Sequence, residues 1–298
     1  MKVKSIFTVL FLVWGLTGAL AQISLSFNPE RGARYEYHTE ATQNIKQSVM
    51  GQEIPTTVIM NTKYLMEIVD KTAQEVTVRF TYSELEYILS SPMMVMAYDS
   101  KSPAENLTGI DQMLGRMFGG MIGQSLTAVF APDGSVKSVT GMEAIGENMV
   151  RAVANDGPMG AQFGAQMRQQ FNDDAIKGMF EQSFKLYPAG TVSVGASWDT
   201  EIMTMASNMN VGVKTKYTLR EVNNNIATVA VEGETEMTIA GMEGKIAGTQ
   251  TGTMTINTRT GIPATGEITQ NARGTIVAQE MNVQMEMVSN VKMTIRAL

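Results

Sequence analysis

The C-terminal stretch of the chain alternates apolar and polar residues with a period of two. Met281, Val283, Met285 and Met287 alternate with Asn282, Gln284 and Glu286, and Val291, Met293 and Ile295 follow with the same spacing. Successive side chains of a β-strand point to opposite faces, so this pattern predicts one buried face and one solvated face. We therefore expect a half-buried antiparallel sheet, with a turn or bulge where Ser289-Asn290 separates the two runs.

Several short patterns occur twice and in the same order. Gly32-Ala33-Arg34-Tyr35 is echoed by Gly195-Ala196-Ser197-Trp198, and Thr62-Lys63-Tyr64 is echoed by Thr215-Lys216-Tyr217. Polar turns follow at 70–74 and at 223–225, and further turns are expected at Asp133-Gly134 and Thr260-Gly261. These echoes predict a β-meander used twice. Chance similarity between threonine-rich strands is the alternative.

Amphipathic helices are predicted between the two β-rich halves. Four stretches repeat apolar residues at helical spacing: Ile110, Met113, Leu114, Met117, Phe118, Met121 and Ile122; then Met142, Ile145, Met149 and Val153; then Met159, Phe163, Met167 and Phe171; and finally Ile176, Met179, Phe180 and Phe184, after a capping signal at 172–174. The expected fold class is α+β and mainly β. We predict a large, curved, half-barrel-like antiparallel sheet covered by several amphipathic helices.

The N-terminus has the features of a signal peptide. Lys2 and Lys4 precede an apolar run, and Ala19-Leu20-Ala21 is a small-residue cleavage pattern. Residues 1–21 are therefore expected to be removed. Because Gln22 follows the cut instead of cysteine, we predict a periplasmic or secreted protein that is not a lipoprotein.

The rest of the chain is predicted to form one domain, residues 22–298. Its parts are a β-half over 22–140 with an inserted helix at about 104–124, a helical segment over 141–187, and a β-half over 188–298. No later segment has the roughly 20 apolar residues that a transmembrane helix needs.

Charge and cysteine content exclude several kinds of partner and site. Without Lys2 and Lys4, 21 basic residues face 29 acidic ones, a formal charge of −8. This balance argues against nucleic acid and against anionic membrane surfaces as partners. The chain has no cysteine, which removes thiol nucleophiles, thiolate metal sites and disulfides.

The sequence gives little support for a catalytic site. The only histidine, His38, has no partner at a recognisable spacing. Ser289 and Lys292 match a Ser-x-x-Lys pattern, but positions three apart in a strand point to opposite faces. Same-face carboxylates such as Glu84 and Glu86, or Glu232, Glu234 and Glu236, fit either an acid/base pair or a solvated outer face, which is the ordinary arrangement. We predict no enzyme, no cofactor and no metal ion.

Methionine is the unusual component, with 25 residues in the chain. Thioether side chains are flexible and polarisable, so a methionine-lined surface can repack around apolar ligands of different shapes. The predicted lining of such a site consists of Met113, Met117, Phe118, Met121, Met203, Met205, Met285 and Met287. Two alternatives stay open: methionine fills an ordinary packed core, or its sulfurs bind Cu(I).

The residues at the starts of the two similar β-rich segments resemble those of known families. Pro29, Gly32 and Tyr35 after an aromatic residue, and Tyr187-Pro188 before Gly195 and Trp198, resemble uncharacterised secreted families of Gram-negative envelopes. At fold level the chain resembles the lipoprotein-localisation half-barrel proteins. That resemblance implies a curved sheet with helices over an apolar cavity, and no binding residue transfers.

These sequence observations lead to one functional hypothesis and one main alternative. We expect a non-catalytic protein that binds a lipid-like molecule or a lipidated partner between sheet and helices. The alternative is a structural or interaction protein of the envelope with a packed, methionine-rich core.

Overall fold

The computed structural model describes residues 22–102, 109–154, 157, 164, 172–206, 209–278 and 281–298. The expected signal peptide and nearly all of the expected helix from Met159 to Phe171 lie outside these residues.

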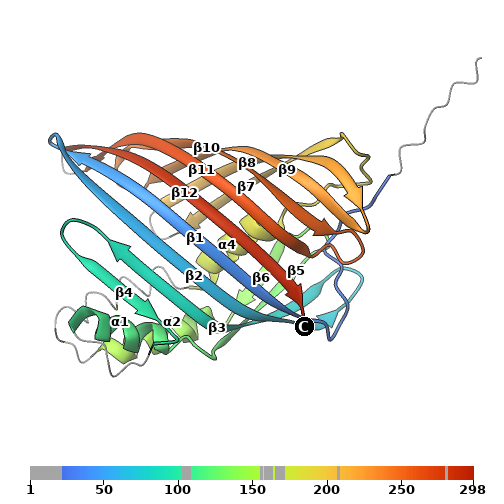
Figure 1. Ribbon diagram of the computed structural model, residues 1–298, viewed down its shortest axis with the longest axis horizontal. Coiled ribbons are helices and arrows are strands. Elements are labelled where there is room, and N and C mark those ends of the chain that lie inside the picture. The colour runs from blue at the N-terminus through green and yellow to red at the C-terminus, as the bar shows by residue number, and fades with distance from the viewer. Residues whose placement is uncertain are drawn as a thin grey trace, which may run out of the picture.

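Strands dominate the described chain, and they form one twelve-stranded antiparallel sheet (Figure 1). The strands are β1 (Arg34–Val49), β2 (Gln52–Lys71), β3 (Val76–Ser90), β4 (Val95–Asp99), β5 (Ser125–Phe130), β6 (Val136–Thr140), β7 (Ser197–Ala206), β8 (Met209–Asn223), β9 (Ile226–Ile239), β10 (Glu243–Asn257), β11 (Pro263–Ala278) and β12 (Met281–Ala297). Their order is β6-β5-β3-β2-β1-β12-β11-β10-β9-β8-β7, with β4 paired to β3. The predicted fold class, mainly β with a large curved antiparallel sheet, is confirmed.

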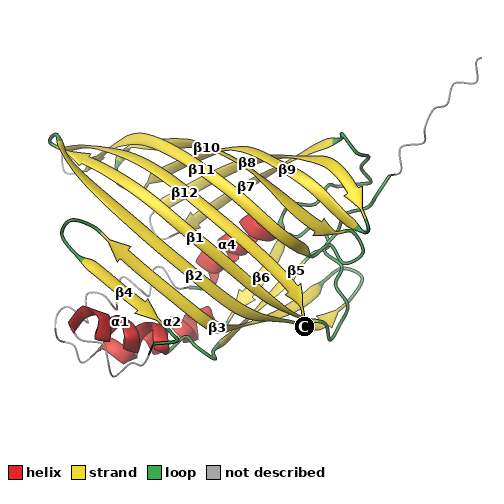
Figure 2. Ribbon diagram, in the orientation of Figure 1, coloured by secondary structure: helices red, strands yellow, loops and turns green. Residues whose placement is uncertain are grey.

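The sheet is open, with β6 and β7 at its two edges, and helix α4 (Asp173–Phe184) packs against both of these strands (Figure 2). The junction with β7 is fixed by hydrogen bonds: Trp198 Nε1 donates to the Leu186 carbonyl at 2.8 Å, and Lys185 Nζ donates to the Glu201 carbonyl at 3.3 Å. Helices α1 (Gly109–Gly119) and α2 (Met142–Val153) pack against each other, and α1 also contacts β4. We call the sheet face that carries α4 the inner face.

An aromatic cluster forms the centre of the core beneath α4. Phe180 and Phe184 of α4 meet Phe80 of β3 and Phe130 of β5, and Phe27 from the N-terminal segment joins them. The ring centroids of Phe80 and Phe180 are 4.6 Å apart in a stacked arrangement. Edge-on and stacked contacts of this kind add to the stability that burial of the large rings already provides. The helix is therefore part of the core that holds the two sheet edges together.

The C-terminal alternation is one continuous strand. β12 pairs without a register shift with both β1 and β11, and Ser289 lies buried on the inner face, opposite Gln43 and Gln270. The predicted turn or bulge at Ser289-Asn290 is therefore wrong. Met287, Ser289 and Val291 keep the same period of two, because a small buried hydroxyl replaces an apolar side chain without changing the phase.

The two similar segment starts have matching backbone hydrogen bonds. The Gly32 N–H donates to the Ile68 carbonyl and the Ile68 N–H to the Ala33 carbonyl; likewise the Gly195 N–H donates to the Leu219 carbonyl and the Leu219 N–H to the Ala196 carbonyl. Both glycines have a positive φ, 83° and 89°. The later predicted hairpins are also present, as β5–β6 and β10–β11.

The predicted helices are present in part. In α2, Met142, Ile145, Met149 and Val153 are all buried. The side chain of Asn172 caps α4 by accepting from the Ala175 N–H at 2.9 Å. The prediction that Met179 lies on the buried face of this helix is wrong. Its side chain is 57% exposed, whereas its neighbour Phe180 is buried.

Candidate functional site

A belt of polar side chains crosses the inner face between two apolar regions. Gln250 Nε2 donates to Thr215 Oγ1 at 2.7 Å, and Gln270 Nε2 donates to Thr235 Oγ1 at 2.8 Å. Thr215, Thr235 and Ser289 are buried. A buried hydroxyl or amide needs a hydrogen-bond partner, and each of these pairs supplies it by reaching across the one strand that lies between the two residues. We call these residues, with Gln43, the polar belt.

A second apolar cluster lies beyond the polar belt, towards the ends of β9–β12 that are far from the aromatic core. We call it the inner apolar patch. It has a buried centre of Ile246, Ala272 and Ile276 and a partly buried surround of Met237, Ile239, Val283, Met285 and Met287. The patch is distinct from the main core cluster. Apolar side chains grouped on a concave face and only partly buried are typical of a surface that binds something.

One thioether in this patch also has a polar contact. Gln43 Nε2, from the polar belt, lies 2.9 Å from Met287 Sδ in hydrogen-bonding geometry. Met285 lies two residues further along β12, on the same inner face. The belt and the patch are thus continuous, and together they place hydrogen-bonding groups beside an apolar surface.

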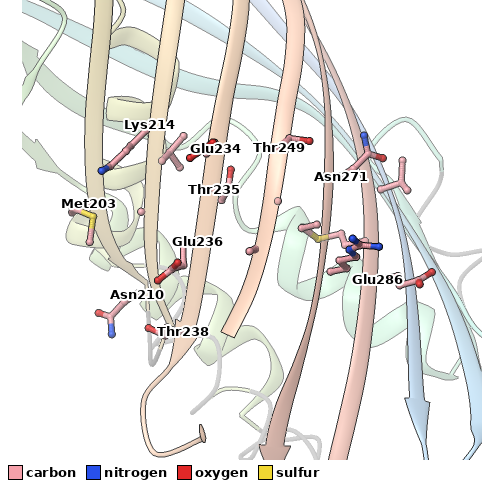
Figure 3. Close-up of a pocket in the computed structure, with 18 of the residues that line it drawn as sticks. Met203, Asn210, Lys214, Glu234, Thr235, Glu236, Thr238, Thr249, Asn271 and Glu286 are labelled. Atoms are coloured by element: carbon pink, nitrogen blue, oxygen red, sulfur yellow. The ribbon is translucent and has the colours of Figure 1, made fainter. Parts of the chain in front are cut away.

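The opposite, outer face carries a hollow of about 920 Å³ across β7–β12 (Figure 3). Its floor runs over small residues such as Gly212 and Ala247. The labelled side chains come from six neighbouring strands and are spread along them, and they do not converge on one point. A hollow of this size can hold a ligand or a short polypeptide segment.

The charged side chains of the hollow are mainly acidic. Glu201, Glu234, Glu236 and Glu286 face only two cations on the lining, Lys214 and Arg273. Lys214 Nζ lies 3.5 Å from Glu201, and Glu236 lies 2.8 Å from Lys245 beside the hollow. These pairs are more than half exposed, so water and salt screen them strongly. The carboxylates of the hollow could bind a partner that carries positive charge.

The predicted site residues on the first helix are in the packed core. Met113, Met117 and Phe118 of α1 are buried, as is Met121 in the turn that follows. The ring of Phe118 contacts Tyr87 and Tyr98, at centroid distances of 5.4 and 5.7 Å. These four residues line neither the outer hollow nor the smaller pocket at Arg31, Arg34 and Arg79.

The four predicted site residues on strands divide between the two faces. Met203 and Met205 are 69% and 70% exposed, and Met203 lines the outer hollow. Met285 and Met287 belong to the inner apolar patch, and Met287 also borders the outer hollow. The eight residues therefore do not enclose one cavity. The reason is the register: β7 presents its odd-numbered positions outward, whereas β12 presents its odd-numbered positions inward.

Of the candidate catalytic groups, His38, Glu84 and Glu86 lie apart from both surfaces, whereas Glu234 and Glu236 line the outer hollow. His38 Nδ1 is 3.8 Å from Glu40 on the outer side of β1. Glu84 lies 2.8 Å from Lys101 and 3.1 Å from Lys63, and the Lys101 ammonium holds the pKa of this carboxyl below its usual range. Asn61 donates to Glu86 at 2.6 Å. In the described part of the chain, no three His, Asp or Glu side chains are grouped as a metal site.

A family comparison matches residues 73–263, from the turn before β3 to the start of β11. This is more than half of the chain, and the family is described as DUF6263, a family of unknown function. The chain belongs to this family. Membership in a family of unknown function is thus confirmed for this DUF6263 protein, whereas the likeness to the lipoprotein-localisation proteins stays a prediction. No curated protein sequence matches the chain.

Solved structures similar to this DUF6263 protein are distant. One is lipovitellin, from a study of its lipid–protein interactions, with 11% identity and a TM-score of 0.45; the match covers 91% of this chain and 25% of that chain. The chain therefore spans about a quarter of the lipovitellin chain. Another is an outer membrane channel from Pseudomonas putida F1, with 8% identity, a TM-score of 0.25, and coverage of 90% and 96%. Among the described helices, each is too short or too polar to cross a membrane.

Sequence reasoning missed the polar belt and the outer hollow. The belt had a signal, because Gln and Thr occupy inward positions of strands that are otherwise apolar, as at Gln250 and Thr215. The hollow had only a partial signal, the same-face carboxylates Glu234 and Glu236, because its residues come from six strands that only the tertiary structure brings together.

Proposed function

We propose that this protein is a non-catalytic binding protein of the cell envelope that holds an apolar ligand, such as a lipid acyl chain, on the inner apolar patch. The observation that carries the proposal is the partial burial of this patch, which lies apart from the main core. Covering apolar surface gains about 25 cal/mol per Å², so an acyl chain laid along these side chains would bind favourably.

The polar belt supports a ligand with a polar end. An acyl chain lying on Met285 and Met287 would have its head group within reach of Gln43, Gln250 and the neighbouring hydroxyls. Hydrogen bonds to such groups orient a ligand, whereas the apolar contacts supply most of the affinity. Methionine suits the apolar part, because its flexible side chain adapts to chains of different shapes.

Binding of a fluorescent fatty acid to the full chain tests the proposal. We expect saturable binding, with affinity lowered at least about tenfold in a Met285→Gln and Met287→Gln double variant, because polar amides replace apolar contacts. The matched control is Val288→Gln, which changes the outer face of the same strand. Equal affinity in all three proteins would contradict the proposal.

Two further measurements address the remaining predictions. Native mass spectrometry of protein purified from its own envelope should show a bound lipid and an N-terminus at Gln22, consistent with export without a lipid anchor. A Cu(I) titration distinguishes the metal alternative: stabilisation by Cu(I) that is lost in the Met285 and Met287 variant would favour thioether coordination over an apolar ligand.

The outer hollow favours a second candidate function, interaction with a partner protein of the envelope. Its four carboxylates and two cations suit a polar segment with positive charge. Such an interaction would weaken with salt, because the charges are exposed. Charge reversal by Glu234→Lys should weaken capture of the partner without changing fatty acid binding, and an unchanged partner affinity would remove this candidate.

A further inference from the structure

The inner face of the sheet has no charged side chain around the polar belt and the inner apolar patch, as far as its strands are described. At this level, inward and outward positions alternate along β1, β2 and β8–β12. The polar side chains among the inward positions end in amides or hydroxyls. A ligand on this face therefore meets apolar surface and neutral dipoles, but no ion.

The same strands are rich in charge on their outer face. Glu234 and Glu236 flank the inward Thr235 on β9, and Lys214 precedes the inward Thr215 on β8. A shift of the register by one residue would bring these charges to the inside. The lack of charge is thus a property of the inner face and not of the composition of the strands.

Core packing does not account for the uncharged inner face, because much of this face is open. Val291 pairs with Ala41 and Ile268 on the aromatic-core side of the polar belt, and it is 36% exposed. Met285 and Met287 in the inner apolar patch are only partly buried. A long charged side chain at such positions could keep its charged end in water. Folding alone therefore does not require these positions to be uncharged.

Helix α4 also keeps its charged side chains away from the interior. Ser183 of α4 faces Tyr37, a buried residue on the inner face of β1. Successive residues of a helix are about 100° apart, so Lys177 and Glu181 lie on the side of α4 that is turned away from Ser183. The described part of α4 therefore adds no charge to the interior beside the inner face.

The polar belt matches a ligand group that both donates and accepts hydrogen bonds. Gln250 and Gln270 each donate one amide N–H to a threonine, and a carboxamide has a second N–H and a carbonyl oxygen. A hydroxyl or amide of a ligand can bond to both. A carboxylate or phosphate only accepts and an ammonium group only donates, and each would leave water without an opposite charge to receive it.

A charge on the ligand is therefore costly at the polar belt, whereas a neutral polar group is not. We propose that the inner face selects lipids whose polar end is an uncharged hydroxyl or amide over lipids whose head group carries a charge. This inference rests on the proposed function, because it specifies the class of ligand that the inner apolar patch holds. A charged lipid can still lay its chain on the patch with its head group in water, but it then loses the contacts with the belt.

Competition against the fluorescent fatty acid on the full chain tests the proposal. The competitors are a monoacylglycerol, a fatty acid and an alkyltrimethylammonium ion of the same chain length, each below its critical micelle concentration. The measurements are made at pH 8, where the carboxylic acid is ionised. The monoacylglycerol should displace the probe at a concentration at least about tenfold lower than either charged lipid, because only its hydroxyls can replace their bonds to water at the belt.

Removal of one hydrogen-bonded pair of the belt separates head-group recognition from chain binding. Gln270→Leu with Thr235→Val replaces both partners of one bond, so neither is left unpaired. The monoacylglycerol should bind at least about fivefold more weakly, while both charged lipids change by less than about twofold. The matched control, Thr251→Val with Gln284→Leu, makes the same changes at exposed outward positions and should leave all three affinities unchanged.

A second variant applies if circular dichroism shows that the double variant does not fold. Gln43 is a partly buried member of the polar belt. Gln43→Leu should reduce the advantage of the monoacylglycerol at least about threefold, because one neutral hydrogen-bonding group is lost.

The possible outcomes distinguish this inference from the proposed function. Equal displacement by the three lipids, or tighter binding of a charged one, would overturn the inference and leave the proposed function standing. An unchanged preference in the folded belt variants would also overturn it, because the belt would then not recognise the head group. If neither the probe nor any of the three lipids binds, the proposed function and the inference are both wrong.

Discussion

Met50 occupies, at one end of the sheet, the same left-handed turn position that Asn224 occupies at the other. The φ values are 52° and 49°, and each residue is the first of two positive-φ residues between paired strands. Asparagine tolerates this conformation, because its short side chain can hydrogen-bond locally, whereas a longer apolar side chain is strained there. The chain thus accepts local strain at Met50, whose side chain is 86% exposed.

The first prediction concerns this strain. Met50→Asn should raise the free energy of unfolding by about 0.5–1 kcal/mol, because asparagine suits the left-handed position. Asn224→Met should lower it by a similar amount. Urea unfolding followed by circular dichroism measures both changes. A loss of stability in Met50→Asn would mean that the methionine has stabilising contacts in the folded protein.

Buried tyrosines predict a loss of stability at alkaline pH. Tyr64 and Tyr82 have ring centroids 4.7 Å apart in the core. Burial raises the pKa of Tyr82 from 10.0 to about 12 and raises the pKa of Tyr64 well above 10.0. Below pH 10 both hydroxyls are neutral whether the chain is folded or not, so this contribution is fully present. Above pH 10 the unfolded chain ionises first, and stability falls as the pH rises through the folded pKa.

The measurement is the urea midpoint between pH 8 and pH 12. Tyr82→Phe should make the alkaline decline shallower, because one ionising group is removed, although the variant also loses the hydroxyl contacts of Tyr82. The slope with pH, and not the absolute stability, is therefore the quantity to compare. An unchanged slope would show that Tyr82 does not control the decline.

The polar belt predicts a cost for removing one partner of a hydrogen bond. Thr215→Val keeps the shape of the side chain but leaves the Gln250 amide without its acceptor. The free energy of unfolding should fall by about 1 kcal/mol, because the half-buried Gln250 amide loses its acceptor. Thr249→Val, on the exposed outer face, is the control and should change stability by less than about 0.5 kcal/mol. Similar losses in both variants would contradict the role given to the belt.

The close approach of α4 to β7 predicts an unusual effect of alanine. At Gly178 a Cβ would lie 2.8 Å from Thr204 Cγ2 and 3.0 Å from its Cβ. Gly178→Ala should destabilise the protein, although alanine is the better helix former, because the helix must move away from the sheet edge. Adding Thr204→Ala should recover part of the loss in thermal unfolding. If Gly178→Ala is stabilising, then helix propensity outweighs the contact.

Much of the fold follows from local patterns. The alternation in β12, the hairpins at β5–β6 and β10–β11, the buried face of α2 and the Asn172 cap all depend on residues close together in sequence. Such features need only the periodicity of a strand or helix and the preferences of turn residues. The mistake at Ser289 has the same origin, because a polar residue within an apolar pattern looks like an interruption until its buried partners are known.

The sites depend on contacts between distant strands. From the apolar pattern we predicted that the side chains of Met203, Met205, Met285 and Met287 are covered, either by the core or by a ligand. The pattern could not tell which pairs share a face of the sheet, because that depends on the register across six strands. The same holds for Met113 and Met117, whose spacing is identical in a packed core and in a ligand site.

The sequence by itself determined that this chain forms a curved antiparallel sheet with amphipathic helices and an excess of methionine, since period and composition are local properties. Only the tertiary structure decided where the methionines lie. Packing buries those of α1 and α2, pairing puts Met285 and Met287 on the inner face, and hairpin ends expose Met50 and Met93. Burial is a property of the assembled sheet, because the same apolar side chain is covered or exposed according to the strands beside it.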